Sequence, residues 1–351
     1  MDGNHTYTEI KSQPAIWAET LDIFRQNAVA LGDLWQGEQF DEVIFTGCGS
    51  TYYLSLIGAK LFQTLVGVPA RAVPASEIVL YPGSVFLDKR KTLLITVSRS
   101  GTTTETIVAS RVFRERTNGT MMSVGCYSES DLMQSADFRL VVDSAREESI
   151  AQTRSFSSML VLVQLIAGYL GGHGDAYSLA LLPDVCDRLL KQYGDAARQL
   201  GEDPNLERFF FLGSDALYGV ACEAMLKLKE MSLSYSEAFH TLEFRHGPMS
   251  MVNEHTLMIG LLSESARTHE LAVLRQMVDQ GAQGLALGNL SAHFSDWATG
   301  VDLGRNIPDW GRPVLYLPVL QLMAYYRALA RGHDPDHPTN LDAVVSLDDL
   351  R

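Results

Sequence analysis

Residues 98–106 carry the clearest chemical signal in the sequence, because they place small hydroxyl side chains around Gly101. They directly follow the apolar run 92–97, which has the composition of a buried strand. A loop of this kind between a strand and a helix offers hydroxyls, free backbone N–H groups and the positive end of a helix dipole, which together suit a phosphate. It has no lysine where a P-loop has one, so a phosphomonoester fits better than a nucleoside triphosphate. The alternative is an ordinary Ser/Thr cap in a solvated loop.

A second group of ionisable residues lies in the other half of the chain. Glu223, Lys227 and Glu230 fall on one face of a predicted helix, a pattern that a surface ion-pair stripe would also give. Further along, His246 precedes Gly-Pro, which ends helices and fixes a turn. A histidine on such a turn can be presented to a pocket or can act as a structural cap, and the residues alone leave both interpretations open.

The elements that must position these residues alternate between strand and helix, which predicts parallel, doubly wound sheets. The long predicted helices cover 14–33, the segment up to 65, 104–114, 155–170, 178–200 and the segment up to 231, with a linker at 201–205. The predicted strands are 42–45, 70–73, 92–97, 121–125 and 138–142, then 209–213, 256–262, 284–287 and 313–316.

The two halves also resemble each other. Phe45-x-Gly47-x4-Tyr52 matches Phe211-x-Gly213-x4-Tyr218, so two related domains explain the chain better than one large sheet. The hydroxyl loop is not repeated, because residues 263–267 place Glu264 there and a carboxylate would repel phosphate. We therefore expect one phosphate site in each chain.

Bulk properties restrict the function classes. The 351 residues carry a formal net charge of -14 and no basic run, which argues against a nucleic-acid partner. The four cysteines lack CxxC spacing, so neither zinc nor a redox motif is expected. No apolar stretch reaches membrane-spanning length, and the N-terminus does not read as a signal peptide, so a cytoplasmic location without membrane attachment is expected.

Several motifs in a fixed order resemble the sugar isomerase (SIS) domains, in the tandem arrangement of the isomerase half of glucosamine-6-phosphate synthase. The resemblance covers about residues 40–350. It implies an α/β fold with two doubly wound parallel-sheet (flavodoxin-like) SIS domains. The expected boundaries are an N-terminal helical segment 1–39, a first SIS domain 40–200 with the phosphate loop, and a second SIS domain 201–351 with a C-terminal tail. The motifs are Gly47-Cys48-Gly49-Ser50-Thr51, Ala75-Ser76-Glu77, Ser98-x-Ser100-Gly101-x-Thr103, Ala224-x-Leu226-Lys227-Leu228-Lys229-Glu230, Phe244-Arg245-His246-Gly247-Pro248 and Pro338-x-Asn340-Leu341.

The resemblance implies roles for single residues and no cofactor or metal. Glu230 matches the carboxylate that moves a proton between C1 and C2 of the open-chain sugar. His246 matches the histidine that assists ring opening in the neighbouring subunit's site, which implies a homodimer with shared sites. The positions that match phosphate ligands are Thr51, Ser98, Arg99, Ser100 and Thr103. Further candidate substrate contacts are Gly49, Ser50, Gln152, Arg154 and Lys227.

The departures from the synthase shape the expected activity. No glutaminase half precedes residue 40, Ala343 stands where the synthase has a tail lysine, and Gln152-Thr153-Arg154 replaces its Ser-Thr-Lys. The sequence therefore predicts an amino-sugar 6-phosphate deaminase/isomerase that releases ammonia and a ketose 6-phosphate, without glutaminase activity. The alternatives are a deglycase of phosphorylated ketosamines, of the fructosamine 6-phosphate type, and a non-catalytic sugar-phosphate sensor.

Overall fold

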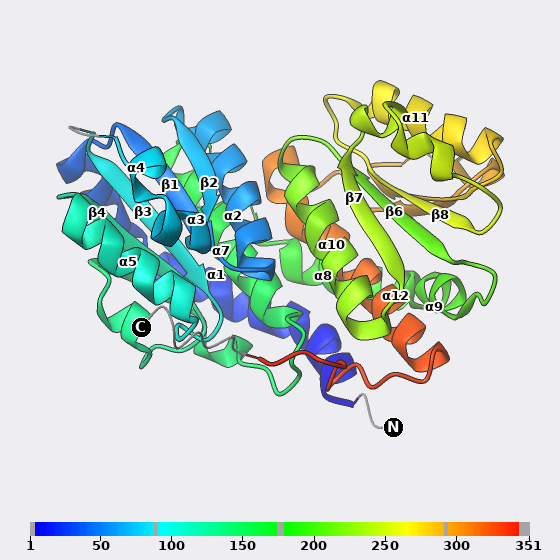
Figure 1. The fold of residues 1–351 in the computed structure, drawn as a ribbon, viewed down its shortest axis with the longest axis horizontal. Helices are drawn as coiled ribbons and strands as arrows, with labels where there is room; N and C mark the ends of the chain where they lie inside the picture. The colour runs from blue at the N-terminus through cyan, green and yellow to red at the C-terminus, as the bar shows by residue number, and fades with distance from the viewer. Residues whose placement is uncertain (1–3, 88–89, 174–178, 291–293, 344–351) are drawn as a thin grey trace. The chain divides into compact units, whose positions relative to one another are not determined.

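The computed structural model describes residues 4–87, 90–173, 179–290 and 294–343, and its backbone contacts divide the chain into two compact units (Figure 1). The first-sheet unit consists of Ala15–Glu147, Arg154–Ala180 and Asp342–Arg351. The second-sheet unit consists of Met1–Pro14, Glu148–Thr153 and Leu181–Leu341. In the described ranges, no helix combines the length and apolar character that a membrane crossing requires.

The first-sheet unit is built on five parallel strands in the order β2-β1-β3-β4-β5. Their central members are buried along their whole length, which is why they read as continuous apolar runs in the sequence. The strands are β1 (Glu42–Gly47), β2 (Ala70–Pro74), β3 (Thr92–Ser98), β4 (Thr120–Gly125) and β5 (Phe138–Val141).

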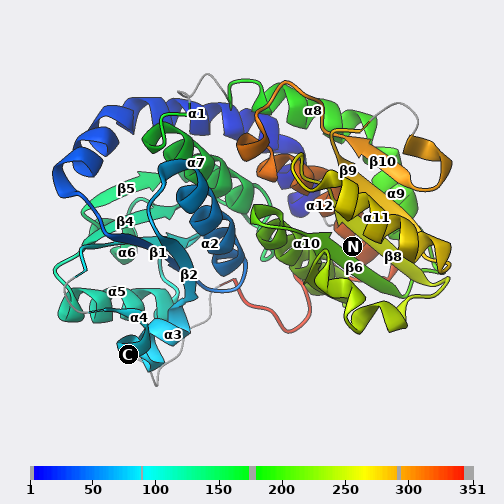
Figure 2. The same ribbon diagram turned by 90° about the horizontal axis from the view of Figure 1, so that it is seen from above.

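Helices cover both faces of this sheet (Figure 2). On one face, Ile78 of α3 and Phe113 of α5 pack with Ile44 and Leu94 of the strands. On the other, α2 packs against α7, and the Trp17 indole N–H of α1 donates to the Ser157 hydroxyl of α7 at 2.9 Å. The helices are α1 (Asn4–Glu38), α2 (Ser50–Leu61) with its π-helical continuation (Phe62–Val66), α3 (Ala75–Leu80), α4 (Pro82–Val85), α5 (Thr104–Arg116), α6 (Asp131–Gln134) and α7 (Arg154–Leu170).

The second-sheet unit repeats the topology, with five parallel strands in the order β7-β6-β8-β9-β10. One face forms a core in which Phe210 and Met258 contact Leu274 of α11 and Phe244. α10 and α12 pack against one another in the same unit. The elements are β6 (Arg208–Gly213), β7 (Tyr235–His240), β8 (Thr256–Leu261), β9 (Gln283–Gly288) and β10 (Thr299–Asp302), with α8 (Leu182–Gln192), α9 (Gly194–Glu202), α10 (Ala216–Ser232), α11 (Arg267–Asp279) and α12 (Leu317–Ala330).

The predicted α/β fold with two doubly wound parallel sheets is confirmed, but several elements differ. The strand expected at 313–316 is wrong, because Pro313–Tyr316 form a 3-10 helix that leads into α12. The segment 178–200 breaks at Tyr193 into α8 and α9, and α9 extends into the predicted linker; residue 178 lies outside the described residues. β7 and β10 were not predicted.

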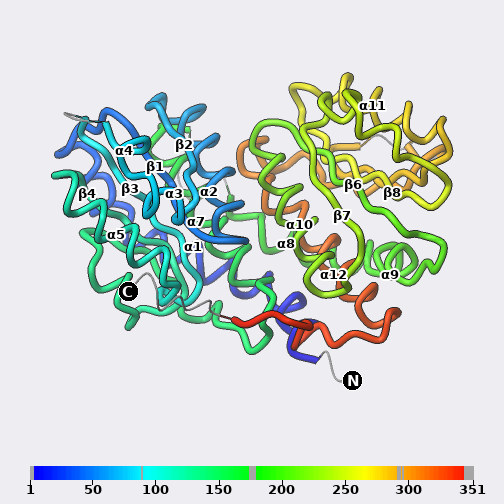
Figure 3. Tube along the Cα trace, viewed as in Figure 1, coloured from blue at the N-terminus to red at the C-terminus, as the bar shows by residue number. Residues whose placement is uncertain are grey.

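The N-terminus of α1 is capped from a distant part of the chain. The Asp336 carboxylate accepts the Thr6 N–H and hydroxyl, both at 2.7 Å, and the His5 N–H at 3.2 Å. Figure 3 shows the segment around residue 336, drawn in red, beside the blue start of this helix. Burial acts to raise the pKa of Asp336, but these hydrogen bonds outweigh it and hold the pKa below its usual range.

We expect Asp336→Ala to lower the free energy of unfolding at neutral pH by about 1 to 2 kcal/mol. The depressed pKa stabilises the fold above the unfolded pKa, and this contribution disappears as the pH falls through the folded pKa. Chemical denaturation across that range should therefore show wild type and variant converging in acid. Asp33→Ala, at an exposed position of the same helix, is the control and should leave stability nearly unchanged at every pH.

Candidate functional site

The predicted phosphate loop joins β3 to α5 at the carboxyl edge of the first sheet. The Ser98 hydroxyl accepts the Gly101 N–H at 3.0 Å, and the Ser100 hydroxyl oxygen accepts the Thr102 N–H at 3.2 Å. Thr103 is the N-cap residue of α5, yet its side chain makes no capping hydrogen bond in the described structure. This leaves the first turn of α5 without the side-chain acceptor that an ordinary Ser/Thr cap would supply, so the turn can bind an anion.

A second loop borders the same crevice. β1 lies beside β3 in the sheet, and the connections leave these two strands in opposite directions, which makes this pair the switch point where ligands bind in such sheets. The loop after β1 contains Gly49, with φ 55°, and leads through Ser50 into α2. The Thr51 hydroxyl exchanges hydrogen bonds with the Cys48 N–H, at 3.0 Å, and the Cys48 carbonyl, at 2.9 Å. The structure thus brings the two predicted phosphate-binding loops to one edge.

Gly101 is required by the geometry of the loop. Its φ is 66°, in the left-handed region, and a Cβ there would lie 2.0 Å from the Ser130 Oγ. We expect Gly101→Ala to distort the loop and to weaken the binding of inorganic phosphate by about tenfold, as measured by titration calorimetry. Gly83→Ala in α4 is the matched control, because nothing lies within 4 Å of a Cβ at that site. Equal phosphate affinity in the two variants would contradict the role of the loop.

Arg99 is bound within its own unit. Its guanidinium lies 3.3 Å from the carboxylate of Glu147, a side chain with no exposed surface, and donates to the Ala343 carbonyl at 3.1 Å. Glu147 also accepts the N–H of Ser155 at 3.1 Å, close to the start of α7. Arg99 therefore ties the phosphate loop to two other segments. Sequence reasoning missed Glu147, although its position in a charged stretch shortly after β5 was a usable signal.

The other predicted contacts divide between the two units. Arg154 donates to the Arg146 carbonyl at 3.1 Å in the first-sheet unit. Gln152 belongs to the second-sheet unit, and its side-chain carbonyl oxygen is buried with no hydrogen-bond partner among the described residues. The backbone before it is held by Glu9, whose carboxylate accepts the Glu148 N–H at 2.6 Å. Gln152 can therefore still accept a hydrogen bond from a ligand.

Three ionisable residues of α10 form a buried cluster, not a surface stripe. The Lys227 side chain is 1 % exposed, and its Nζ lies 2.5 Å from Glu230 Oε2 and 3.5 Å from Glu223 Oε1. Glu223 has no exposed surface, whereas Glu230 retains 17 %. The ammonium thus holds in place the one carboxylate of this cluster that solvent reaches, as a group that exchanges protons with a substrate requires.

His246 lies on an exposed turn of the same unit. It follows the 3-10 turn Glu243–Arg245, which the buried Phe244 anchors in the core, and its N–H bonds to the Glu243 carbonyl at 3.0 Å. Gly247 then takes φ 119°. No hydrogen bond or ion pair joins His246 to Glu230 in the described part of the chain. The imidazole is presented outward from its unit.

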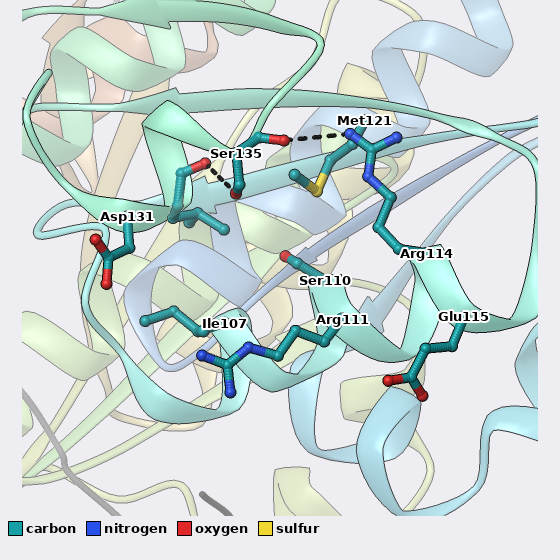
Figure 4. Close-up of a pocket in the computed structure, with 9 residues that line it drawn as sticks. Ile107, Ser110, Arg111, Arg114, Glu115, Met121, Asp131 and Ser135 are labelled. Atoms are coloured by element: carbon teal, nitrogen blue, oxygen red, sulfur yellow. Dashed lines mark hydrogen bonds between the residues drawn. The ribbon is translucent and has the colours of Figure 1, made fainter.

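A pocket of about 410 Å³ lies elsewhere on the first-sheet unit, between α5, α6 and β4 (Figure 4). Ile107, Met121 and Leu132 contribute apolar surface, and Arg114 at its edge bonds to the Ser135 carbonyl at 3.2 Å. None of the predicted site residues lines it. In the described ranges, no group of three or more His, Cys, Asp or Glu residues is arranged to hold a metal ion.

Comparison with known proteins matches the chain to one family. The SIS domain model matches residues 39–168 and 205–294. Glutamine–fructose-6-phosphate aminotransferase (isomerizing) from Methanothermobacter thermautotrophicus is 27% identical over 346 residues, covering 97% of this chain and 57% of the relative. The enzyme of the same name from Chlamydia abortus is 29% identical over 327 residues, covering 89% of this chain and 52% of the relative. The chain thus spans little more than half the length of these curated relatives.

Two solved structures match nearly the whole chain. Glucosamine-6-phosphate deaminase from Thermotoga maritima superposes with a TM-score of 0.78 at 28% identity, covering 98% of this chain and 100% of that one. Tagatose-6-phosphate ketose/aldose isomerase from Escherichia coli gives a TM-score of 0.88 at 23% identity, covering 96% of this chain and 97% of that one. At 23% identity, the match to the tagatose-6-phosphate isomerase shows that the two chains share a fold and nothing more.

Proposed function

Because the chain belongs to the SIS domain family, we propose that it is a phosphosugar isomerase-type enzyme, and more specifically an amino-sugar 6-phosphate deaminase/isomerase. Its substrate would be a 2-amino-2-deoxyhexose 6-phosphate, and its products a ketose 6-phosphate and ammonia. The observation that carries the proposal is the uncapped, hydroxyl-rich start of α5 at the switch point of the first sheet. The full-length match to a glucosamine-6-phosphate deaminase favours this reaction over others of the family.

The phosphate would be bound by the two loops after β1 and β3. The N–H groups at the start of α5, with the hydroxyls of Ser98, Ser100 and Thr103, would form hydrogen bonds to its oxygens, and Thr51 would border it. Arg99 would act by holding the loop, because its guanidinium already binds Glu147. Gly49 and Ser50, where the loop after β1 leads into α2, would contact the remainder of the sugar, and Gln152 remains a predicted substrate contact.

Glu230 would be the general base. It would remove the C2 proton of the ring-opened amino sugar and return it to C1, which converts the aldose into a ketose-type intermediate whose C2 imine is hydrolysed to release ammonia. Lys227 would orient the Glu230 carboxylate through their 2.5 Å contact. His246 would assist ring opening.

We also propose that the enzyme works as a homodimer with shared sites. The motivation is that His246 is exposed on a turn with Leu242 and Met251 nearby in sequence, both large apolar side chains with more than 40 % of their surface exposed. A second copy that covered this turn would bury apolar surface and receive the imidazole. The domain boundaries at 39/40 and 200/201 remain predictions.

Incubation of the purified protein with glucosamine 6-phosphate and its epimers tests the reaction. Release of ammonia together with fructose 6-phosphate or another ketose 6-phosphate supports the proposal. A protein that binds these sugars but releases neither product at any pH from mildly acidic to mildly alkaline would refute it. A parallel panel of phosphorylated ketosamines tests the deglycase alternative, for which Arg99 and Arg154 are poorly placed since both already bind protein groups.

A further inference from the structure

The second sheet has its own switch point, and its loops copy the geometry of the first. β6 and β8 correspond to β1 and β3 in strand order. Asp215, at the N-cap of α10, has φ 51° and ψ -126°, almost the conformation of Gly49 (φ 55°, ψ -123°) at the N-cap of α2. The Ser263 hydroxyl accepts the Ala266 N–H at 3.1 Å, as the Ser98 hydroxyl accepts that of Gly101. The second sheet therefore repeats two backbone features of the first phosphate-binding loops, and we call these two places the first and the second seat.

The charges in the two loops are reversed. In the first, Arg99 pairs with Glu147, which follows the edge strand β5. In the second, the equivalent position is Glu264, and it pairs with Arg312, which follows the edge strand β10. Both arginine side chains are 8 % exposed. In the first pair the loop residue is basic and its partner is acidic. In the second pair the loop residue is acidic and its partner is basic.

Donors surround the Glu264 carboxylate as they would surround a bound oxyanion. One oxygen accepts from Asn289 at 2.9 Å and from the Arg312 guanidinium, and the other accepts from Arg267 at 2.9 Å. Asn289 is itself held by Arg305 at 2.9 Å. Burial acts to raise the pKa of Glu264, but the bonds from Asn289 and Arg312 outweigh it and lower the pKa below its usual range.

We propose that Glu264 is a built-in substitute for a bound oxyanion, and that it closes a second seat that would otherwise accept inorganic phosphate or a phosphomonoester. The seat differs from the first in its donors. Ser263 already gives its N–H to Glu270 at 2.7 Å, so the ligand would be held by the Arg312, Arg267 and Asn289 side chains. With Glu264 removed, the charged groups around the seat are Arg267, Arg305 and Arg312 against Asp309 and Glu270, a net charge of +1. This proposal does not depend on the reaction proposed above.

Phosphate binding by Glu264→Ser and Glu264→Gln tests the proposal. Both are combined with Ser100→Asp, which places a carboxylate in the first loop and blocks that seat. Inorganic phosphate is titrated at constant ionic strength, with sodium chloride as the reference, and followed by thermal unfolding and calorimetry. We expect Ser100→Asp alone to show no response, and the Glu264→Ser combination to gain about 3 °C or more in Tm in millimolar phosphate with one binding event in each chain.

Glu254→Gln is the matched control, because this acid lies in the same unit and is 79 % exposed. It should not change the phosphate response. If Glu264→Ser unfolds in the absence of phosphate because the buried Arg312 loses its carboxylate partner, phosphate should restore the folded state where chloride does not. Variants at Glu264 that fold without a phosphate response, or that phosphate fails to rescue, would overturn the proposal. A Ser100→Asp protein that still binds phosphate would instead count against the first seat.

Discussion

Glu230→Gln is expected to lose turnover of the sugar phosphate by about a thousandfold while it continues to bind phosphate. The amide has the shape of the carboxylate and can still accept a hydrogen bond from Lys227, 2.5 Å away in the native protein. It cannot take up the C2 proton, so the loss should fall on kcat, with little change in KM. A general base accounts for a loss of this size, whereas a residue that only fills space does not.

The measurement pairs product formation with a binding assay. Ammonia and ketose phosphate are followed at saturating substrate, and inorganic phosphate is titrated by thermal shift to show that the first seat is intact. Glu237→Gln, a change of the same chemistry in β7 of the same unit, serves as the control and should keep wild-type kcat. Full activity in Glu230→Gln would remove Glu230 from the mechanism, although the phosphate site could remain valid.

Most of the fold could be predicted from the sequence because the central strands of a parallel sheet are buried on both faces. They leave continuous apolar runs in the sequence, as in β3 and β8. The two missed strands lie at the edges of the second sheet. β7 mixes Ser236, Glu237 and His240 with apolar residues, and β10 is only four residues long. Pro313–Tyr316 was wrong because a short, fully buried apolar run looks the same in a helix and in a strand.

The site was predictable where it depends on local chemistry and unpredictable where it depends on pairing between distant residues. The hydroxyls and Gly101 of the first loop are local features, and their composition alone predicts an anion-binding loop. The pairing of Arg99 with Glu147 is not local. The charged stretch after β5 marks Glu147 as a candidate, but it lies 48 positions from Arg99 and meets it only when β3 and β5 join the same sheet. The reversed pair of Glu264 and Arg312 is likewise 48 positions apart and becomes visible only when the two sheets are compared.

The helical spacing of Glu223, Lys227 and Glu230 did not predict that this α10 cluster is buried. Its burial leads to the largest change in stability that we expect from a single substitution. Lys227→Met should lower the free energy of unfolding by about 3 to 5 kcal/mol, because the fully buried Glu223 carboxylate would lose its ammonium partner. The expected readout is a fall in Tm of about 10 °C. Lys229→Met is the control. This lysine is exposed on the same helix, so its replacement should change the free energy of unfolding very little.

A double variant separates the cost of a buried unpaired charge from simple loss of packing. In Glu223→Leu combined with Lys227→Met, the inner part of the cluster becomes apolar and no carboxylate is left buried alone. Replacing a buried ion pair by apolar residues of similar volume is often nearly neutral, so the double variant should recover much of the stability lost in Lys227→Met. If the two changes simply add, the ammonium contributes through packing, and the electrostatic explanation fails. Catalysis should not recover with stability, because Glu230 would still lack the ammonium that holds its carboxylate in place.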